Sequence, residues 1–285
     1  MRLRGIRRSK NVEVRGGRRG RAGGRAGGRA GGLGMAGVVL VLAIGYFTGI
    51  DVSPLLQGGD QPQSQQSGQV TEADSRATQF SAQVLATTED VWGKVFAEQL
   101  DRRYVPPQLV VFSGTTQSPC GGASGATGPF YFPADSKAYL DTQFFATLDQ
   151  RMGAGGDFAA AYVIAHEVAH HVQNQLGILP KVNAERQRST EAQANALTVR
   201  LELMADCLSG IWASNVQGLM ERGDLEEALN AARKIGDDHL QRQAGRVPQP
   251  HTFTHGTSEQ RARWFERGYA SGRVGSCDTF AARQL

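Results

Sequence analysis

The chain of 285 residues is 40% hydrophobic and 20% charged, a composition typical of a globular protein with one main domain. Its net charge of +4 is unevenly distributed, because residues 1–32 hold eleven Lys or Arg and one Glu. That segment therefore carries +10 and leaves −6 for the rest of the chain. The remainder gives no general reason to expect nucleic acid as a partner.

The basic segment, residues 1–32, is predicted to be a disordered cytoplasmic tail. It contains three consecutive Gly-Arg-Ala-Gly repeats. A stretch of Gly and Arg without apolar residues cannot bury enough surface to offset the entropy of the chain. RNA binding by this arginine-glycine segment is the alternative.

Residues 33–50 are predicted to form a single transmembrane helix that anchors the protein in membrane lipid. Between Arg29 and Asp51 lie 21 uncharged residues, and a helix of that length spans about 31 Å, the thickness of a bilayer core. A secretory signal peptide is the alternative, but it would have a short basic segment and a small-residue cleavage site. The positive-inside rule places residues 1–32 inside and everything after Asp51 outside.

A hydrophilic linker is predicted over residues 51–78, which are rich in Gln, Ser, Gly and Asp, and the globular domain follows as residues 79–285. A helix over 87–100 is predicted to begin at a capping Thr87 or Thr88. Outside the candidate site, strands are expected over 108–113, 130–132 and 137–141, with a Gly-rich loop over 114–128. Helices are expected over 142–152 and 258–269, and another is expected to begin at Asp224 with a capping box.

The most informative stretch is His166-Glu167-x-x-His170. Two His four positions apart lie on one face of a helix, so both imidazoles can bind one zinc ion. Such an ion lowers the pKa of a bound water to about 7, and Glu167 is placed to take a proton from that water. A surface helix with scattered His and Glu is the alternative. Residues 158–172, however, are apolar on nearly every side, which indicates a core helix where unpaired polar groups are costly.

A second long helix is predicted from Thr190 to about Met220, and it carries the best candidate for a third ligand. Glu202 and Asp206 lie four positions apart in an apolar run. Glu202 is expected to complete a His₂Glu zinc site, and Asp206 to accept the other ring N–H of a ligand His. The alternative is an ion pair between one of these carboxylates and a cation such as Arg200.

A peptidase also needs a donor for the oxyanion of its tetrahedral intermediate. His255, in a loop just before the last helix, is a candidate catalytic residue for this role, and Tyr131 and Tyr139 are alternatives. A capping or surface role for His255 is the other possibility. Of the three Cys, we expect Cys207 and Cys277 to pair and Cys120 to stay free, while a buried unpaired Cys207 is the alternative.

The pattern H-E-x-x-H, followed on a second helix by E-x-x-x-D, resembles the gluzincin class of zinc peptidases. The wider sequence is similar to the bacterial neutral zinc metallopeptidase family (YpfJ type). The segments that carry this resemblance, which together span about residues 70 to 280, are 120–123, 128–135, 138–141, 165–173, 202–207, 254–261 and 276–280. The family pattern has Cys at the position of Phe132, so it implies no disulfide for Cys120 in this chain.

The resemblance implies a zincin-like α+β domain, mainly helical with a small β-sheet, in which an edge strand binds extended substrate by backbone pairing. A hairpin that only covers the core is the alternative for residues 128–141. We therefore expect a zinc metallopeptidase that hydrolyses peptide bonds with a zinc-activated water and Glu167 as general base. It would be anchored in the inner membrane of a bacterium, with the catalytic domain on the periplasmic side. A catalytically inactive, metal-stabilised scaffold that binds partners is the alternative.

Overall fold

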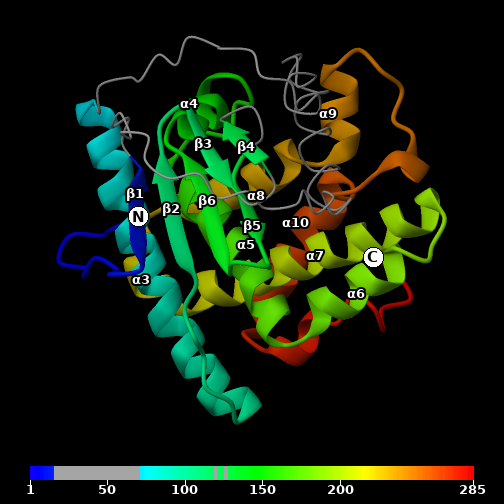
Figure 1. Ribbon diagram of the computed structural model, residues 1–285, viewed down its shortest axis with the longest axis horizontal. Coiled ribbons are helices and arrows are strands. Elements are labelled where there is room, and N and C mark those ends of the chain that lie inside the picture. Colours follow the sequence, from blue (N-terminus) through cyan, green and yellow to red (C-terminus); the bar gives the residue numbers. More distant parts are fainter. Residues whose placement is uncertain (16–70, 119–120, 125–127) are drawn as a thin grey trace, which may run out of the picture.

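The computed structural model describes residues 1–15, 71–118, 121–124 and 128–285. A mixed four-stranded sheet, in the order β1-β2-β6-β5, packs against a layer of helices (Figure 1). Three parallel strands and one antiparallel edge strand form it: β1 (Val12–Arg15), β2 (Gln108–Phe112), β6 (Lys137–Asp141) and β5 (Phe130–Phe132). The predicted helical α+β domain with a small sheet is confirmed.

Helices make up most of the described chain. They are α3 (Glu72–Leu100), α4 (Gln143–Gln150), α5 (Asp157–Gln175), α6 (Ile178–Arg186), α7 (Glu191–Asn215), α8 (Asp224–Lys234), α9 (Asp237–Gln243) and α10 (Ser258–Ser271), with short 3₁₀ turns η2 (Gln217–Leu219), η3 (Pro250–Thr252) and η4 (Val274–Cys277). Among the helices of these described segments, none is both long and apolar enough to cross a membrane. The predicted transmembrane segment, residues 33–50, lies outside the described residues.

The N-terminal residues 1–15 are folded onto the domain, so the prediction of a disordered tail is wrong for this part of residues 1–32. β1 pairs in parallel with β2, and Leu3 is buried. Ile6 and Val12 pack against the main hydrophobic core. The Gly-Arg repeats begin only at residue 20, and averaging composition over the whole segment concealed the apolar residues that precede them.

Helix α3 begins well before the predicted start. Thr71 caps it in a capping box with Asp74, so residues 72–78 are helical and the predicted linker is wrong there. Thr87 and Thr88, predicted as caps, are buried inside the helix, where their hydroxyls donate to the carbonyls of Val84 and Leu85. A Thr that satisfies its hydroxyl on the preceding turn does not interrupt a helix.

The centre of the core is α5, which is buried at every position from Phe158 to Ala169. This confirms the prediction of a core helix from its apolar surroundings. Helices α7 and α10 pack closely, because Gly268 has no side chain and a Cβ there would collide with the carbonyl of Cys207. Thr190 caps α7 in a capping box with Gln193, as the sequence predicted for the start of that helix.

Three other predictions differ from the structure. The loop predicted over 114–128 contains the antiparallel strands β3 (Thr115–Ser118) and β4 (Gly121–Ser124). Helix α7 ends at Asn215 rather than near Met220. No side chain caps α8, because its N-cap residue is Gly223, and the carboxylate of Asp224 accepts the backbone N–H of Glu221 at 2.8 Å. The short helices α6 and α9 were not predicted.

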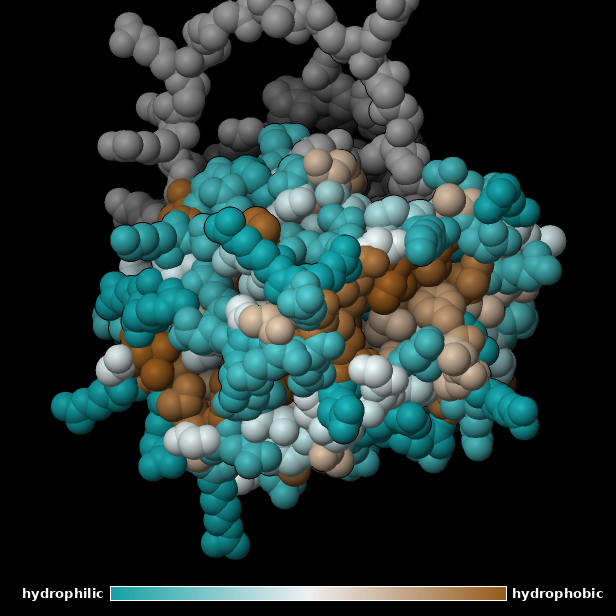
Figure 2. Space-filling model, turned by 90° about the horizontal axis from the view of Figure 1, so that it is seen from below, coloured by the Kyte–Doolittle hydropathy of each residue, from teal (hydrophilic) through white to brown (hydrophobic). Residues whose placement is uncertain are grey.

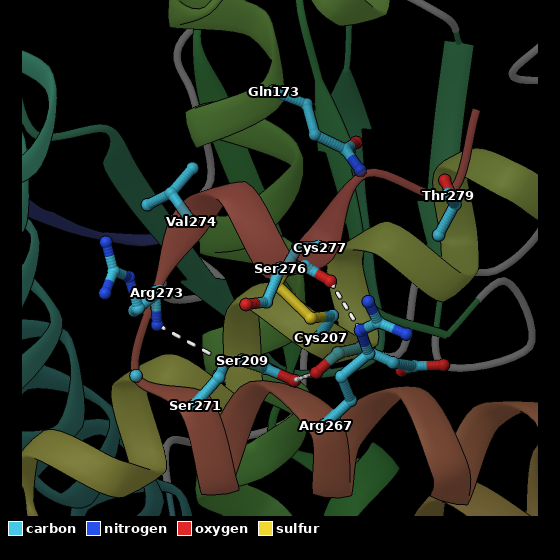
Figure 3. The surroundings of a disulfide bond; sticks show 12 residues. Gln173, Cys207, Ser209, Arg267, Ser271, Arg273, Val274, Ser276, Cys277 and Thr279 are labelled. Carbon is cyan, nitrogen blue, oxygen red and sulfur yellow. Dashed lines mark hydrogen bonds between the residues drawn. A yellow bond between two sulfur atoms is a disulfide. The ribbon is translucent and has the colours of Figure 1, made fainter. Parts of the chain in front are cut away.

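A disulfide joins Cys207 in α7 to Cys277 in η4, which confirms the predicted pair (Figure 3). It ties the C-terminal segment to the helix that carries Glu202, and Arg267 supports the same turn by donating to the carbonyl of Ser276 at 2.7 Å. A mainly apolar groove of about 370 Å³ lies beside the disulfide. Apolar residues are also exposed on the face seen from below (Figure 2). Cys120 lies outside the described residues.

Candidate metal centre

Helices α5 and α7 bring His166, His170 and Glu202 together, as the sequence predicted. The Nε2 atom of His166 lies 3.0 Å from Oε2 of Glu202, and the Nε2 atom of His170 lies 3.3 Å from Oε1 of the same carboxylate. One ligand atom from each of the three residues fits within 4.8 Å of the others. The two rings lie on one face of α5 in an edge-to-face arrangement, with centroids 4.9 Å apart and planes at 89°.

Acceptors behind both imidazoles hold the Nε2 atoms toward Glu202. Nδ1 of His166 donates to Oδ1 of Asp206 at 2.9 Å, the role predicted for Asp206. Nδ1 of His170 donates to the side-chain oxygen of Gln173 at 2.9 Å, and Gln173 in turn donates to the carbonyl of Leu201 at 2.7 Å. Such partners fix the tautomer and orientation of ligand histidines.

Sequence reasoning missed Gln173 as a partner of His170. Its position three residues after His170 on the same helix is the signal that could have indicated it, since side chains at i and i+3 are neighbours.

The donor set fits a zinc ion. Two imidazoles and one carboxylate are common zinc ligands, and ligand atoms about 2.0–2.1 Å from a tetrahedral ion lie roughly 3.3 Å apart, close to the His–Glu separations here. The cluster contains three donors among the residues described by the structure. A closed structural zinc site uses four protein ligands, so a set of three fits a site with an open position.

The charges around the cluster favour a cation. Burial acts to lower the pKa of His166, but the carboxylates of Asp206 and Glu202 outweigh it and raise that pKa to about 10. Burial acts to raise the pKa of Glu202, but His170 and His166 hold it well below its ordinary value. A metal ion would replace the protons that these imidazoles otherwise hold.

Glu167 follows the first ligand on the same helix and differs from Glu202 in its surroundings. It is buried, and burial raises its pKa above the ordinary value, although His170 and His166 act against this. No hydrogen bond or ion pair of the Glu167 carboxylate is found in the described part of the chain. A buried carboxylate with a raised pKa, beside a metal cluster, is suited to accept and return a proton.

A buried ion pair supports the first ligand from behind. Asp206 accepts two hydrogen bonds from Arg261, at 2.9 Å from Nε and 2.9 Å from Nη2, and one from the hydroxyl of Tyr162 at 2.5 Å. Sequence reasoning missed both Arg261 and Tyr162. Arg261 lies within the resembling segment 254–261, but no local pattern indicates that its partner is on a helix more than fifty residues earlier.

His255 is buried, and Asp237 binds both its imidazole ring and its backbone. One carboxylate oxygen of Asp237 lies 3.1 Å from Nδ1 of His255, and the other accepts the backbone N–H groups of Thr254, His255 and Gly256. Burial acts to lower the pKa of His255, but the charges of Asp237 and Glu202 raise it. His255 is therefore no surface residue, and it lies within electrostatic reach of the third ligand. Sequence reasoning missed Asp237.

The two tyrosines considered as alternatives to His255 are engaged elsewhere. The hydroxyl of Tyr131 lies 2.9 Å from Nδ1 of His171, and Tyr139 donates to Asp135 at 2.7 Å. Neither hydroxyl has a hydrogen bond to a residue of the His–His–Glu cluster within the described ranges. Of the three candidates, His255 alone is coupled to Glu202 by its charge.

Similarity to known proteins agrees with this site. A model of the family described as "Putative neutral zinc metallopeptidase" matches residues 1–280. "Uncharacterized protein YpfJ" of Escherichia coli strain K12 is 47% identical over 286 residues, which cover 98% of this chain and 99% of that protein. "Uncharacterized protein Rv2575" of Mycobacterium tuberculosis strain H37Rv is 41% identical over 195 residues, which cover 64% of this chain and 65% of that protein. No solved structure matches the chain. The chain thus belongs to the neutral zinc metallopeptidase family.

Proposed function

We propose that the protein is a zinc-dependent metallopeptidase. The observation that carries the proposal is the buried cluster of His166, His170 and Glu202 with Glu167 beside it on α5. When bound there, zinc would supply Lewis-acid activation of a water molecule and of the substrate carbonyl. An incomplete ligand set and an adjacent carboxylate with a raised pKa both serve catalysis, and a purely structural site needs neither.

The protein's own residues divide the proton transfers. Glu167 takes a proton from the attacking water and returns it to the leaving amine, as a general base and then a general acid. His255, whose pKa is raised by Asp237 against the effect of burial, donates a hydrogen bond to the carbonyl oxygen as negative charge develops there. Asp206 holds His166 in the orientation that presents Nε2 to the metal.

The edge strand β5 is the proposed binding site for the peptide backbone. β5 is at the end of the sheet and pairs only with β6 among the described strands. It also packs against α5, the helix that carries Glu167 (Figure 1). An extended peptide that added a strand to this edge would have its carbonyl groups aligned along the candidate metal centre.

The membrane placement belongs to the proposal as well. An apolar stretch of residues 33–50 would hold the protein at the lipid, and residues 1–15 and the domain, which share one sheet, would lie together outside the inner membrane. The disulfide between Cys207 and Cys277 supports an oxidising compartment.

The test uses the full chain, purified and assayed for zinc by elemental mass spectrometry and for cleavage of a mixed peptide library. The native protein is expected to hold about one zinc per chain and to cleave peptides. Glu167→Gln should keep the zinc and lose cleavage, because it removes the general base and no ligand. Glu202→Ala should lose both.

Full activity of the Glu167→Gln protein would contradict the base assignment. Zinc retained after Glu202→Ala would place the third ligand elsewhere. Zinc without any cleavage by the native protein would favour the metal-stabilised scaffold.

A further inference from the structure

Arg186 is the last residue of α6, a helix that packs against α7, which carries the proposed third ligand (Figure 1). Leu179 and Val182 of α6 pack in a small apolar cluster with Leu201, the residue directly before Glu202. This packing fixes α6 against α7, and Arg186 follows Val182 by one helical turn on the same face of α6. The Arg186 side chain is therefore held by a helix rather than by a loop, and it is partly buried.

The guanidinium of Arg186 has few partners for a buried cation. Nη1 donates to the side-chain oxygen of Asn183 at 3.2 Å, and Nε is buried without a hydrogen-bond partner. No carboxylate within the described parts of the chain lies within 4 Å of it. Arg residues are rarely buried unless they are paired, because an unsatisfied buried donor on a charged group is costly.

Two other arginines show what Arg186 lacks. Arg188, on the same turn, is 73% exposed and pairs with Glu185 at 2.9 Å. Arg261 is fully buried but has the carboxylate of Asp206 at 2.9 Å. Arg186 is partly buried and has no carboxylate partner of either kind, so its guanidinium is available to a carboxylate from another molecule.

Glu202 is the charged residue that acts on Arg186. Burial lowers the pKa of Arg186, and the negative charge of Glu202 acts against this from beyond ion-pair distance. A metal ion bound to Glu202 would take up that negative charge, so it would leave Arg186 as a cation without a counter-charge beside the site. A substrate that brings its own negative group would restore the balance.

We infer that Arg186 binds a carboxylate of the peptide substrate and so gives the enzyme a preference for acidic peptides. The inference rests on the proposed peptidase function. A guanidinium matches a carboxylate with two parallel hydrogen bonds, which is the geometry that its unused N–H groups can offer. The carboxylate is either the C-terminal group of the peptide or the side chain of an Asp or Glu near the scissile bond.

The experiment measures kcat/KM of the zinc-loaded full chain on matched peptides derived from one that the native protein cleaves. One pair differs only in a free or amidated C-terminus, and another only in Glu or Gln on either side of the scissile bond. We expect the carboxylate form of one pair to be the better substrate. The pair that shows this preference identifies which carboxylate Arg186 binds, the C-terminal group or a Glu side chain. Arg186→Met should remove that preference, roughly ten- to a hundredfold through KM, and leave the neutral peptide unchanged. Arg188→Met, which removes an exposed cation from the same turn, should change neither.

Arg186→Glu keeps the inference testable if the Met variant folds poorly, since it should favour peptides with Lys at the same position. Equal cleavage of charged and neutral forms by the native protein would overturn the inference and leave the peptidase function intact. An equal loss on both forms in Arg186→Met would also overturn it, because that result indicates a structural role.

If the native protein cleaves no peptide, the proposed function fails separately. Calorimetric binding to the zinc-loaded chain then decides the role of Arg186, with short peptides that differ only in a free or amidated C-terminus or only in Glu or Gln at one position. Binding of the carboxylate form that is lost in Arg186→Met supports the inference, and its absence or its persistence in the variant refutes it.

Discussion

Replacing Asp206 by Asn tests whether the buried ion pair behind the metal cluster stabilises the fold. The side chains of Asp206 and Arg261 are 0% and 2% exposed, and the carboxylate accepts four hydrogen bonds from Arg261, Tyr162 and His166. An amide has one acceptor atom in place of two and no charge, so Arg261 would lose a bond and its counter-ion. Breaking a buried pair by removing one partner costs about 3–5 kcal/mol of stability. For a chain of this size the melting temperature should fall by about 6–20 °C.

Thermal unfolding of the full chain, followed by circular dichroism in the presence of a chelator, separates this effect from loss of zinc. Glu185→Gln is the matched control, because its partner Arg188 is on the surface and such pairs contribute about 0–1 kcal/mol. The double variant Asp206→Asn with Arg261→Met should lose less free energy of unfolding than the two single variants lose together, because no unpaired charge remains. A stability of Asp206→Asn within about 1 kcal/mol of the native protein would refute the reasoning.

Three further predictions concern the metal, the oxyanion donor and the disulfide. The pKa of His166 in the metal-free protein is raised to about 10, so zinc must displace a proton from it. The apparent zinc affinity should therefore rise about tenfold per pH unit for each proton displaced between about pH 6 and pH 9. Competition with a chromophoric chelator measures this affinity, and an affinity that does not change with pH would contradict the prediction. His255→Gln should lower kcat about 100- to 1000-fold with unchanged zinc content, and a loss of zinc would instead indicate a structural role. Cys277→Ser removes a link across 70 residues and should lower the free energy of unfolding by about 2–4 kcal/mol, measured by urea titration. The native protein in reductant should be as unstable as this variant. If the variant were as stable as the oxidised native protein, the disulfide would be dispensable.

The candidate metal ligands could be predicted because their signal is local. His166 and His170, and likewise Glu202 and Asp206, are four positions apart on a helix, and this spacing alone places each pair on one face. The apolar residues around them also indicated that both helices are buried, which the structure confirms. Spacing within one helix is encoded in the sequence without reference to the rest of the fold.

The residues that support the ligands could not be predicted in the same way. Arg261 meets Asp206 across 55 positions, and Asp237 meets His255 across 18. Neither pair follows from a helical period, because the first depends on how α10 packs against α7 and the second on how the loop before α10 returns to the start of α9. Thr87 was misread for a related reason, since only the tertiary context shows whether a Thr caps a helix or lies within it.

The N-terminal strand sets a condition on the membrane placement. β1 is hydrogen-bonded to β2, and Arg7 pairs with Glu89 and Asp90 of α3 at 2.7 and 2.6 Å, so residues 1–15 and the domain form one body. If residues 33–50 crossed a bilayer once, with the tail inside and the domain outside, β1 would have to leave the sheet. We therefore expect Arg8→Cys and Glu98→Cys, each placed in a Cys120→Ser background, to react alike with a membrane-impermeant thiol reagent in intact cells. Opposite reactivity would mean that β1 is released, and the sheet would then consist of β2, β6 and β5 in the membrane-bound protein.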